Sequence, residues 1–423
     1  MKQGLRWGLG FLVLIIGGVV AGMPGFTGRM AETAYRSGIE DMNLRISANP
    51  ELSGQIEITQ YDRGLYSSSV VTRYSLQNSM LNFDVVQELQ HGFTGAQFEG
   101  YAIPRGRTRE VLEQLGGGDD TFQFNGRYGI DDVEFVVMMN ALSGVLDADP
   151  DVQLNLAPLQ IDGQMANSGE TVRLAMDWGG LALRSLTTPD VVEMERMGGQ
   201  VNAVLIAGDT SLGVWEGDFG MNITGLTANV DGAESFAVEA IDLAGRTDVD
   251  QGNRIDSRFT LSFESLTSMG MDPLRGAATL RSEGLLVEPL LELARQAEQL
   301  GDDAPYERLL ADAIDQGVTL YLTEAELAAG PQRRLSADAE LVIKPEMANL
   351  LRAGLVGLGA LDAMDFELVV GLDQALANSL PRELGVWLAQ MRAFGVLRTQ
   401  DDRLEFNLRL QDGEVLVHGE PWG

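Results

Sequence analysis

The sequence predicts a mainly β protein with some α-helix, of the α+β class. An N-terminal transmembrane helix should precede a large antiparallel twisted sheet with several amphipathic helices packed on it. Three observations predict this fold. An uncharged apolar run comes early in the chain, and short alternating apolar and polar segments then recur from Gly54 to Val287. Helical periodicity is concentrated after them, as expected when hairpins come first and helices later.

Composition limits the function classes. The chain has 423 residues, 45% of them hydrophobic, which is typical of a folded protein. Its formal net charge is −32, so phosphate backbones repel it and we expect no nucleic-acid partner. With no cysteine, disulfides, thiolate catalysis and cysteine-ligated zinc are excluded. The acidity fits adaptation to salt and genome composition equally, and both explanations stay open.

The first element is an apolar segment at residues 7–23 that carries no charge. As a helix it spans roughly 25 Å, the short end of what a bilayer core requires. Lys2 and Arg6 precede it, which predicts a cytoplasmic tail at residues 1–6 and the rest of the chain outside. A cleaved signal peptide ending at Val20-Ala21-Gly22 is the alternative. We favour an uncleaved anchor because this tripeptide matches A-x-A poorly and a helical pattern follows.

Two further features surround the anchor. Gly18 and Gly22 form a G-x-x-x-G spacing, which permits close approach of two helices and a homodimer, although glycine is common in transmembrane helices anyway. Residues 24–50 form a helical linker in which Met30 and Ala34 begin an apolar pattern at near-helical spacing.

The antiparallel β-rich body covers residues 51–287. Its first strand places Ile56 and Ile58 on one face, and the turn residues Asp62–Gly64 predict a hairpin. The chain returns through Ser67–Ser69. Because side chains alternate along a strand, these three serines cannot converge on one atom.

The later elements are helices and a final hairpin. Residues 288–395 form a helix–strand region packed on the sheet, beginning with a helix that has Pro289 in its first turn and Leu290 and Leu293 on its apolar stripe. Residues 396–423 form a C-terminal β-hairpin around Asp412-Gly413.

Catalytic chemistry has little support in the sequence. His91 could be combined with Ser67 and Asp62 as a serine–histidine–acid set, so a periplasmic hydrolase using His91 with a nearby serine or aspartate is the alternative function. The sequence has no G-x-S-x-G elbow, H-E-x-x-H, Walker loop or dinucleotide fingerprint. The segment from Asp248 departs from a calcium loop and suits a β-turn better. We therefore expect no catalytic residue, metal or cofactor, and a non-enzymatic envelope binding or scaffold module.

A hairpin signature, Y-x-R-G-x-Y/F-S-S, carries a family resemblance. It is followed by a histidine-glycine pair, by paired strands and by a terminal hairpin, in an order that covers nearly the whole chain. This order resembles the YdgA-like family of bacterial envelope proteins of unknown function. Phe93 stands where that family typically has proline after the histidine-glycine pair. The signature residues are Tyr61, Arg63, Gly64, Tyr66, Ser67, Ser68, His91 and Gly92.

The resemblance implies a single-pass protein of the bacterial inner membrane with its body in the periplasm, a homodimer, and no known catalysis, so the signature residues have structural roles. The ligand we expect is a lipid acyl chain or an apolar segment of an envelope protein. Inward-facing leucine, valine and methionine positions and the membrane tether suggest it. A fully packed core explains the same residues and is the simpler alternative.

Overall fold

The computed structural model describes residues 28–48, 54–76, 81–92, 95–129, 131–147, 149–166, 169–209, 213–268, 272–296, 303–379 and 382–422. The predicted cytoplasmic tail at 1–6 and anchor at 7–23, with Gly18 and Gly22, lie outside these residues. Of the helices within them, none has the length and apolarity needed to cross a membrane. The chain divides into two compact units, Met1–Asn202 with Leu226–Ala233 and Ala203–Gly225 with Glu234–Gly423.

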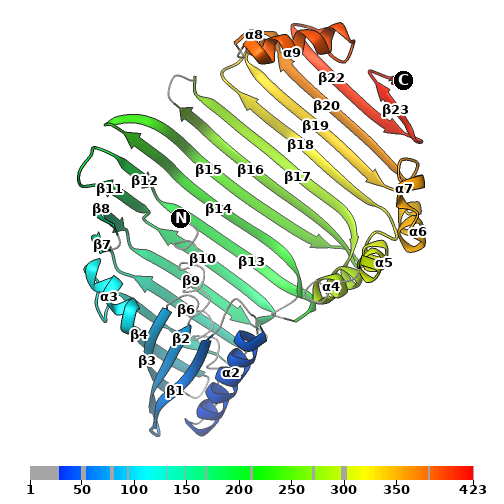
Figure 1. Ribbon diagram of the computed structural model, residues 1–423. Coiled ribbons are helices and arrows are strands. Elements are labelled where there is room, and N and C mark those ends of the chain that lie inside the picture. Colours follow the sequence, from blue (N-terminus) through cyan, green and yellow to red (C-terminus); the bar gives the residue numbers. More distant parts are fainter. Residues whose placement is uncertain are drawn as a thin grey trace. The chain divides into compact units, whose positions relative to one another are not determined.

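Strands dominate both units and pair antiparallel, so the predicted mainly β fold with a large antiparallel sheet and a few helices is confirmed (Figure 1). The segment boundaries drawn from the sequence remain predictions.

The first unit is built on eight strands that follow one another by hydrogen bonding in the order β1, β2, β3, β4, β5, β6, β9, β10. Two helices, α2 and α3, belong to it. A shorter ribbon pairs β7 with β8, β8 with β11, and β11 with β12. The bounds are α2 Gly28–Ala48, β1 Gly54–Arg63, β2 Ser67–Leu76, β3 Leu81–Gly92, β4 Gly95–Pro104, α3 Gly106–Gln114, β5 Phe122–Tyr128, β6 Asp132–Met139, β7 Leu142–Leu146, β8 Asp149–Leu156, β9 Leu159–Ala166, β10 Thr171–Trp178, β11 Leu181–Ser185 and β12 Val191–Met194.

The core of this unit lies on one face of the eight-stranded sheet. Alternation along each strand sends apolar side chains to that face, where α2 contributes buried Tyr35 and Ile39. Tyr35 Oη lies 2.7 Å from Thr72 Oγ1, which satisfies both buried hydroxyls. At the free edge of β1, the Asn43 amide donates to and accepts from the backbone of Ile56, both at 2.8 Å. These contacts fix α2 on the sheet.

The second unit continues the antiparallel pattern through β15, β16, β17, β18, β19, β20 and β22, with β21 and β23 paired to different stretches of β22. The bounds are β13 Met197–Gly208, β14 Gly213–Val230, β15 Ala233–Val249, β16 Arg254–Ser268, β17 Leu274–Leu286, α4 Val287–Gln296, α5 Asp303–Ala313, β18 Val318–Ala328, β19 Arg334–Ile343, α6 Glu346–Ala353, α7 Val356–Gly359, β20 Met364–Asp373, α8 Gln374–Ser379, α9 Arg382–Ala393, β21 Arg398–Gln400, β22 Arg403–Gln411, β23 Glu414–Val417 and β24 Glu420–Pro421.

The turn between β22 and β23 has Asp412 and Gly413 at φ angles of 50° and 78°. Positive φ at both central residues is the conformation of a type I′ hairpin turn, for which the Asp-Gly sequence is favoured.

The helices of the second unit gather at the ends of its strands instead of spreading over one face as the sequence suggested (Figure 1). Ala311 of α5 and Met347 of α6 pack with Val318 and Ile343, which lie at strand ends, in one small core. Val287 and Leu291 of α4 pack with Ile255 in another. Chain order and antiparallel pairing place α4–α7 at one end of the strands and α8–α9 at the other.

Candidate functional site

The hairpin that carries the family signature brings a serine and a histidine together. Ser68 Oγ on β2 lies 2.8 Å from His91 Nε2 on β3. Ser67 does not make this contact, because it pairs with Gln90 and projects to the other face of the sheet. Asp62 lies opposite Ser69, also on the face away from Ser68. The set of Ser67, His91 and Asp62 considered from the sequence is therefore not assembled, and Ser68 is the serine that meets His91.

The serine–histidine pair is largely buried. Ser68 is 3% exposed, and the other imidazole nitrogen of His91, Nδ1, is buried without a hydrogen-bond partner within the described chain. Burial lowers the pKa of His91 below its ordinary value, so the ring is neutral near pH 7. No carboxylate of the described residues orients this ring, and a hydrolytic triad requires one.

Two other signature residues, Tyr61 and Arg63, hold the hairpin against α2. The Tyr61 ring packs edge-on against Tyr35 at 6.3 Å, and the Arg63 guanidinium lies 3.4 Å from the Glu32 carboxylate. A side chain at Gly64 would place its Cβ 2.6 Å from the Ser67 carbonyl oxygen. Gly92 ends β3 opposite Gly95, and Tyr66 is exposed at the hairpin tip. The structural role of the signature stays a prediction.

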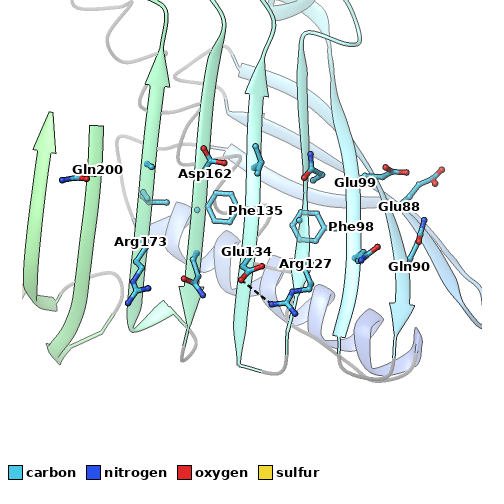
Figure 2. Close-up of a pocket in the computed structure, with 18 of the residues that line it drawn as sticks. Glu88, Gln90, Phe98, Glu99, Arg127, Glu134, Phe135, Asp162, Arg173 and Gln200 are labelled. Carbon is cyan, nitrogen blue, oxygen red and sulfur yellow. Dashed lines mark ion pairs between the residues drawn. The ribbon is translucent and has the colours of Figure 1, made fainter. Parts of the chain in front are cut away.

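The open face of the first unit carries a polar groove of about 770 Å³ (Figure 2). Because directly paired residues share a face, the registers align its side chains in two rows that cross six strands. One row contains mainly acidic and amide groups: Glu88, Glu99, Asn125, Val136, Asp162 and Ala175. The other contains Gln90, Gln97, Arg127, Glu134, Gln164 and Arg173.

Large and small residues alternate across the floor of this groove. The Phe98 ring lies over Gly126, where a Cβ would sit 2.5 Å from ring atom Cζ, and the Phe135 ring lies over Gly163, with a corresponding distance of 2.1 Å. Both rings are buried on the core side. Amides, carboxylates and two arginines therefore face the solvent, a set that suits a polar ligand and not an acyl chain.

The sheet of the second unit has an apolar face that sequence analysis did not locate. Its central row crosses eight strands through directly paired residues: Gly245, Phe259, Leu280, Leu322, Ala339, Leu368, Leu408 and Val417. The next row on one side contains Leu320, Leu341, Phe366 and Leu410. On the other side come first Ala325, Ala337, Val370 and Phe406, and then Leu327, Leu335, Leu372 and Leu404. We call these residues, with Leu261 and Phe219, the apolar face.

Much of the apolar face stays open within the described part of the second unit, although Leu404 and Val417 are buried. Phe259, Leu261, Leu280, Leu320 and Leu335 are between 36% and 54% exposed. Phe219 is also exposed, and its ring lies over Gly245 and 6.0 Å from the ring of Phe259. A sheet normally buries its hydrophobic face against another layer. This face therefore presents a contiguous apolar surface to whatever contacts it.

The opposite face of the same strands is charged. Its matching row runs through Arg246, Arg258, Arg281, Tyr321, Glu340, Glu367 and Arg409. The period-two alternation that predicts an apolar face and a charged face is interrupted in β18. After Leu320 and Leu322 the next apolar residue is Ala325, three positions on instead of two. In the structure this interruption is a β-bulge at Glu324, which has a φ of 55°. The extra residue returns Ala325 and Leu327 to the apolar face.

No cluster of three or more histidine, aspartate or glutamate side chains suited to a metal occurs in the part of the chain that the structure describes. The model of a family described as "Bacterial protein of unknown function (DUF945)" matches residues 1–422, in agreement with the resemblance found in the hairpin signature. No curated protein and no solved structure matches the chain.

Proposed function

For a chain that belongs to DUF945, a family of bacterial proteins of unknown function, we propose the role of a non-enzymatic binding module whose apolar face holds lipid acyl chains. In this proposal residues 7–23 anchor the chain in the inner membrane, with the N-terminus in the cytoplasm and the body in the periplasm. The observation that carries the proposal is the exposed, contiguous apolar face of the second unit.

The size of the apolar face supports an extended ligand. Strands in a sheet lie about 4.8 Å apart, so a row across eight strands extends roughly 34 Å. A bilayer core of about 30 Å contains two acyl layers, so one acyl chain covers roughly half of such a row. Two chains fit end to end, or several side by side across the neighbouring rows.

The driving force is the apolar surface that remains open. The exposed fractions of Phe259, Leu261, Leu280, Leu320 and Leu335 together equal about two complete side chains. Covering them contributes about 3–6 kcal/mol at the usual ~1.5–3 kcal/mol for each side chain. That is enough to retain a lipid through purification when further contacts from the neighbouring rows are added.

The net charge favours a lipid over a second copy as the occupant. Two chains that each carry a formal charge of −32 repel one another when their sheets approach face to face. An acyl chain adds no charge at the apolar face. The buried Ser68–His91 pair lies in the other unit, and its imidazole has no orienting carboxylate among the described residues, so we assign it no catalytic role.

Cross-linking in intact bacteria tests the lipid proposal with the full chain. The photoreactive residue p-benzoylphenylalanine replaces Leu280 on the apolar face or, as a matched control on the same strand, Ala277 on the charged face. After irradiation, the mass of the purified chain is measured. We expect a phospholipid adduct at position 280 and none at position 277. A chain–chain adduct without lipid at position 280, or equal lipid at both positions, would refute the proposal.

A fusion tests the topology separately. Alkaline phosphatase joined after Pro421 folds only in the periplasm, so we expect an active fusion and an intact Met1 in the mature chain. A mature chain that begins near Met23 would contradict the anchor and leave the lipid proposal standing.

A further inference from the structure

The helix α9 presents an apolar stripe that the described residues leave largely exposed. Leu384, Trp387, Met391 and Phe394 follow one another at spacings of three, four and three residues, which places them on one side of a helix. Leu384 is 48% exposed, Trp387 51% and Phe394 76%. The helical hydrogen bonding continues to Phe394, whose N–H donates to the Gln390 carbonyl at 2.9 Å, and Gly395 ends it with a φ of 73°.

The segment that carries this stripe has a formal charge of opposite sign to that of the whole chain. Between Asp373 and Asp401 the sequence contains three arginines and a single acid, Glu383, whereas the whole chain has 62 acids and 30 bases. Arg392 is exposed and makes no ion pair with any described residue, and Arg398 pairs with Glu420 at 3.0 Å. Residues 374–400 therefore carry a small positive charge within a strongly acidic chain, and Arg392 is a cation among them that is left without an ion pair by the described residues.

We propose that α9 docks on an anionic lipid surface, with Leu384, Trp387 and Phe394 entering the interfacial layer and Arg392 contacting the headgroups. An exposed tryptophan beside an exposed phenylalanine suits the boundary between acyl chains and headgroups. Arg392, next to the stripe, gains most from an anionic surface, and this short-range attraction acts where salt screens the longer-range repulsion from the net charge of −32. An acidic protein surface would offer the charge but not the apolar layer for these aromatic side chains.

The position of α9 in the second unit links this docking to the apolar face. α8 and α9 lie at the strand ends opposite to α4–α7, and the row of Leu335, Leu372 and Leu404 is the part of the apolar face nearest to them. Docking of α9 would bring this end of the apolar face beside a bilayer. The docking itself does not depend on lipid binding at the apolar face, so each proposal can fail alone.

Vesicle co-flotation tests the docking. The full chain is held in phosphatidylcholine nanodiscs and mixed with vesicles of phosphatidylglycerol and phosphatidylethanolamine, or of phosphatidylcholine alone. The variants are Leu384→Glu and Trp387→Glu. Leu355→Glu is a matched control because Leu355 has the same 48% exposure and follows α6 at the opposite strand ends.

We expect co-flotation of the unchanged chain and the Leu355→Glu variant with anionic vesicles, and a fall of about tenfold or more for each α9 variant. Arg392→Gln should weaken binding to anionic vesicles roughly fivefold and leave the weak binding to phosphatidylcholine unchanged. Equal flotation of all variants would overturn the proposal. A change of oligomeric state in the α9 variants, seen by light scattering without any loss of flotation, would also overturn it.

Discussion

Leu280 offers the sharpest test of the apolar face, because the same strand provides a control. Leu280 points to the apolar face between Phe259 and Leu322, and it is 54% exposed. Ala277 on the same strand is exposed on the charged face. Leu280→Asp and Ala277→Asp therefore add the same charge to the same strand but on opposite faces.

The size of the effect follows from the exposed fraction. Complete burial of a leucine contributes about 1.5–3 kcal/mol, so covering the open half of Leu280 contributes about 0.8–1.6 kcal/mol. Placing a carboxylate under an acyl chain adds a desolvation cost of about 1–3 kcal/mol. The expected loss for Leu280→Asp is thus about 1.8–4.6 kcal/mol, a fall in affinity of roughly 20- to 2,000-fold.

The assay is titration of the purified full chain with a fluorescent fatty acid, after delipidation. The fatty acid is anionic, but Ala277→Asp corrects for charge repulsion. We expect Ala277→Asp to bind within about twofold of the unchanged chain, since a surface substitution away from the ligand has little effect. Circular dichroism confirms that both variants are folded. Equal affinities of the two variants would show that the acyl chain does not lie on the apolar face.

Three further predictions concern the first unit. Burial alone would raise the pKa of Asp84, but hydrogen bonds from two arginines outweigh it and lower this pKa. Asp84→Asn should therefore reduce the free energy of unfolding by about 1–3 kcal/mol above pH 4, and by less as the pH falls further. Urea unfolding at pH 7 and pH 3 measures this difference. Burial lowers the pKa of His91, so the unfolded chain binds a proton more readily below about pH 6.5. Stability should therefore fall from pH 7 to pH 5.5, and by less in His91→Gln; equal slopes would contradict the burial argument. Gly163→Ala puts a methyl group 2.1 Å from a Phe135 ring atom and should cost about 1–3 kcal/mol in thermal unfolding, whereas Gly357→Ala, with open space around it, should not.

The sequence determined those features that depend on neighbouring residues. Period-two alternation is the local signature of an antiparallel strand, and an Asp-Gly pair at positive φ turns β22 into β23. The residues of the hairpin signature, with the order of elements that follows it, were sufficient to identify the family. Net charge, a property of composition alone, argued against a nucleic-acid partner.

Only the tertiary structure decided which groups meet across the sheet. Three consecutive serines are equivalent in the sequence, and the pairing of β2 with β3 selects Ser68 as the partner of His91. The bulge at Glu324 interrupts the alternation in β18, so the local pattern did not show that Leu327 shares a face with Leu322.

The sequence also could not show whether the apolar face is covered by other segments of the chain. Alternation predicts that a strand has an apolar side, but it does not say what covers that side. The amphipathic helices were expected on the sheet, yet α4–α6 bury their stripes against strand ends such as Val318 and Ile343. Whether an apolar face becomes core or binding surface depends on where distant segments pack. That is a property of the whole fold and not of any local pattern.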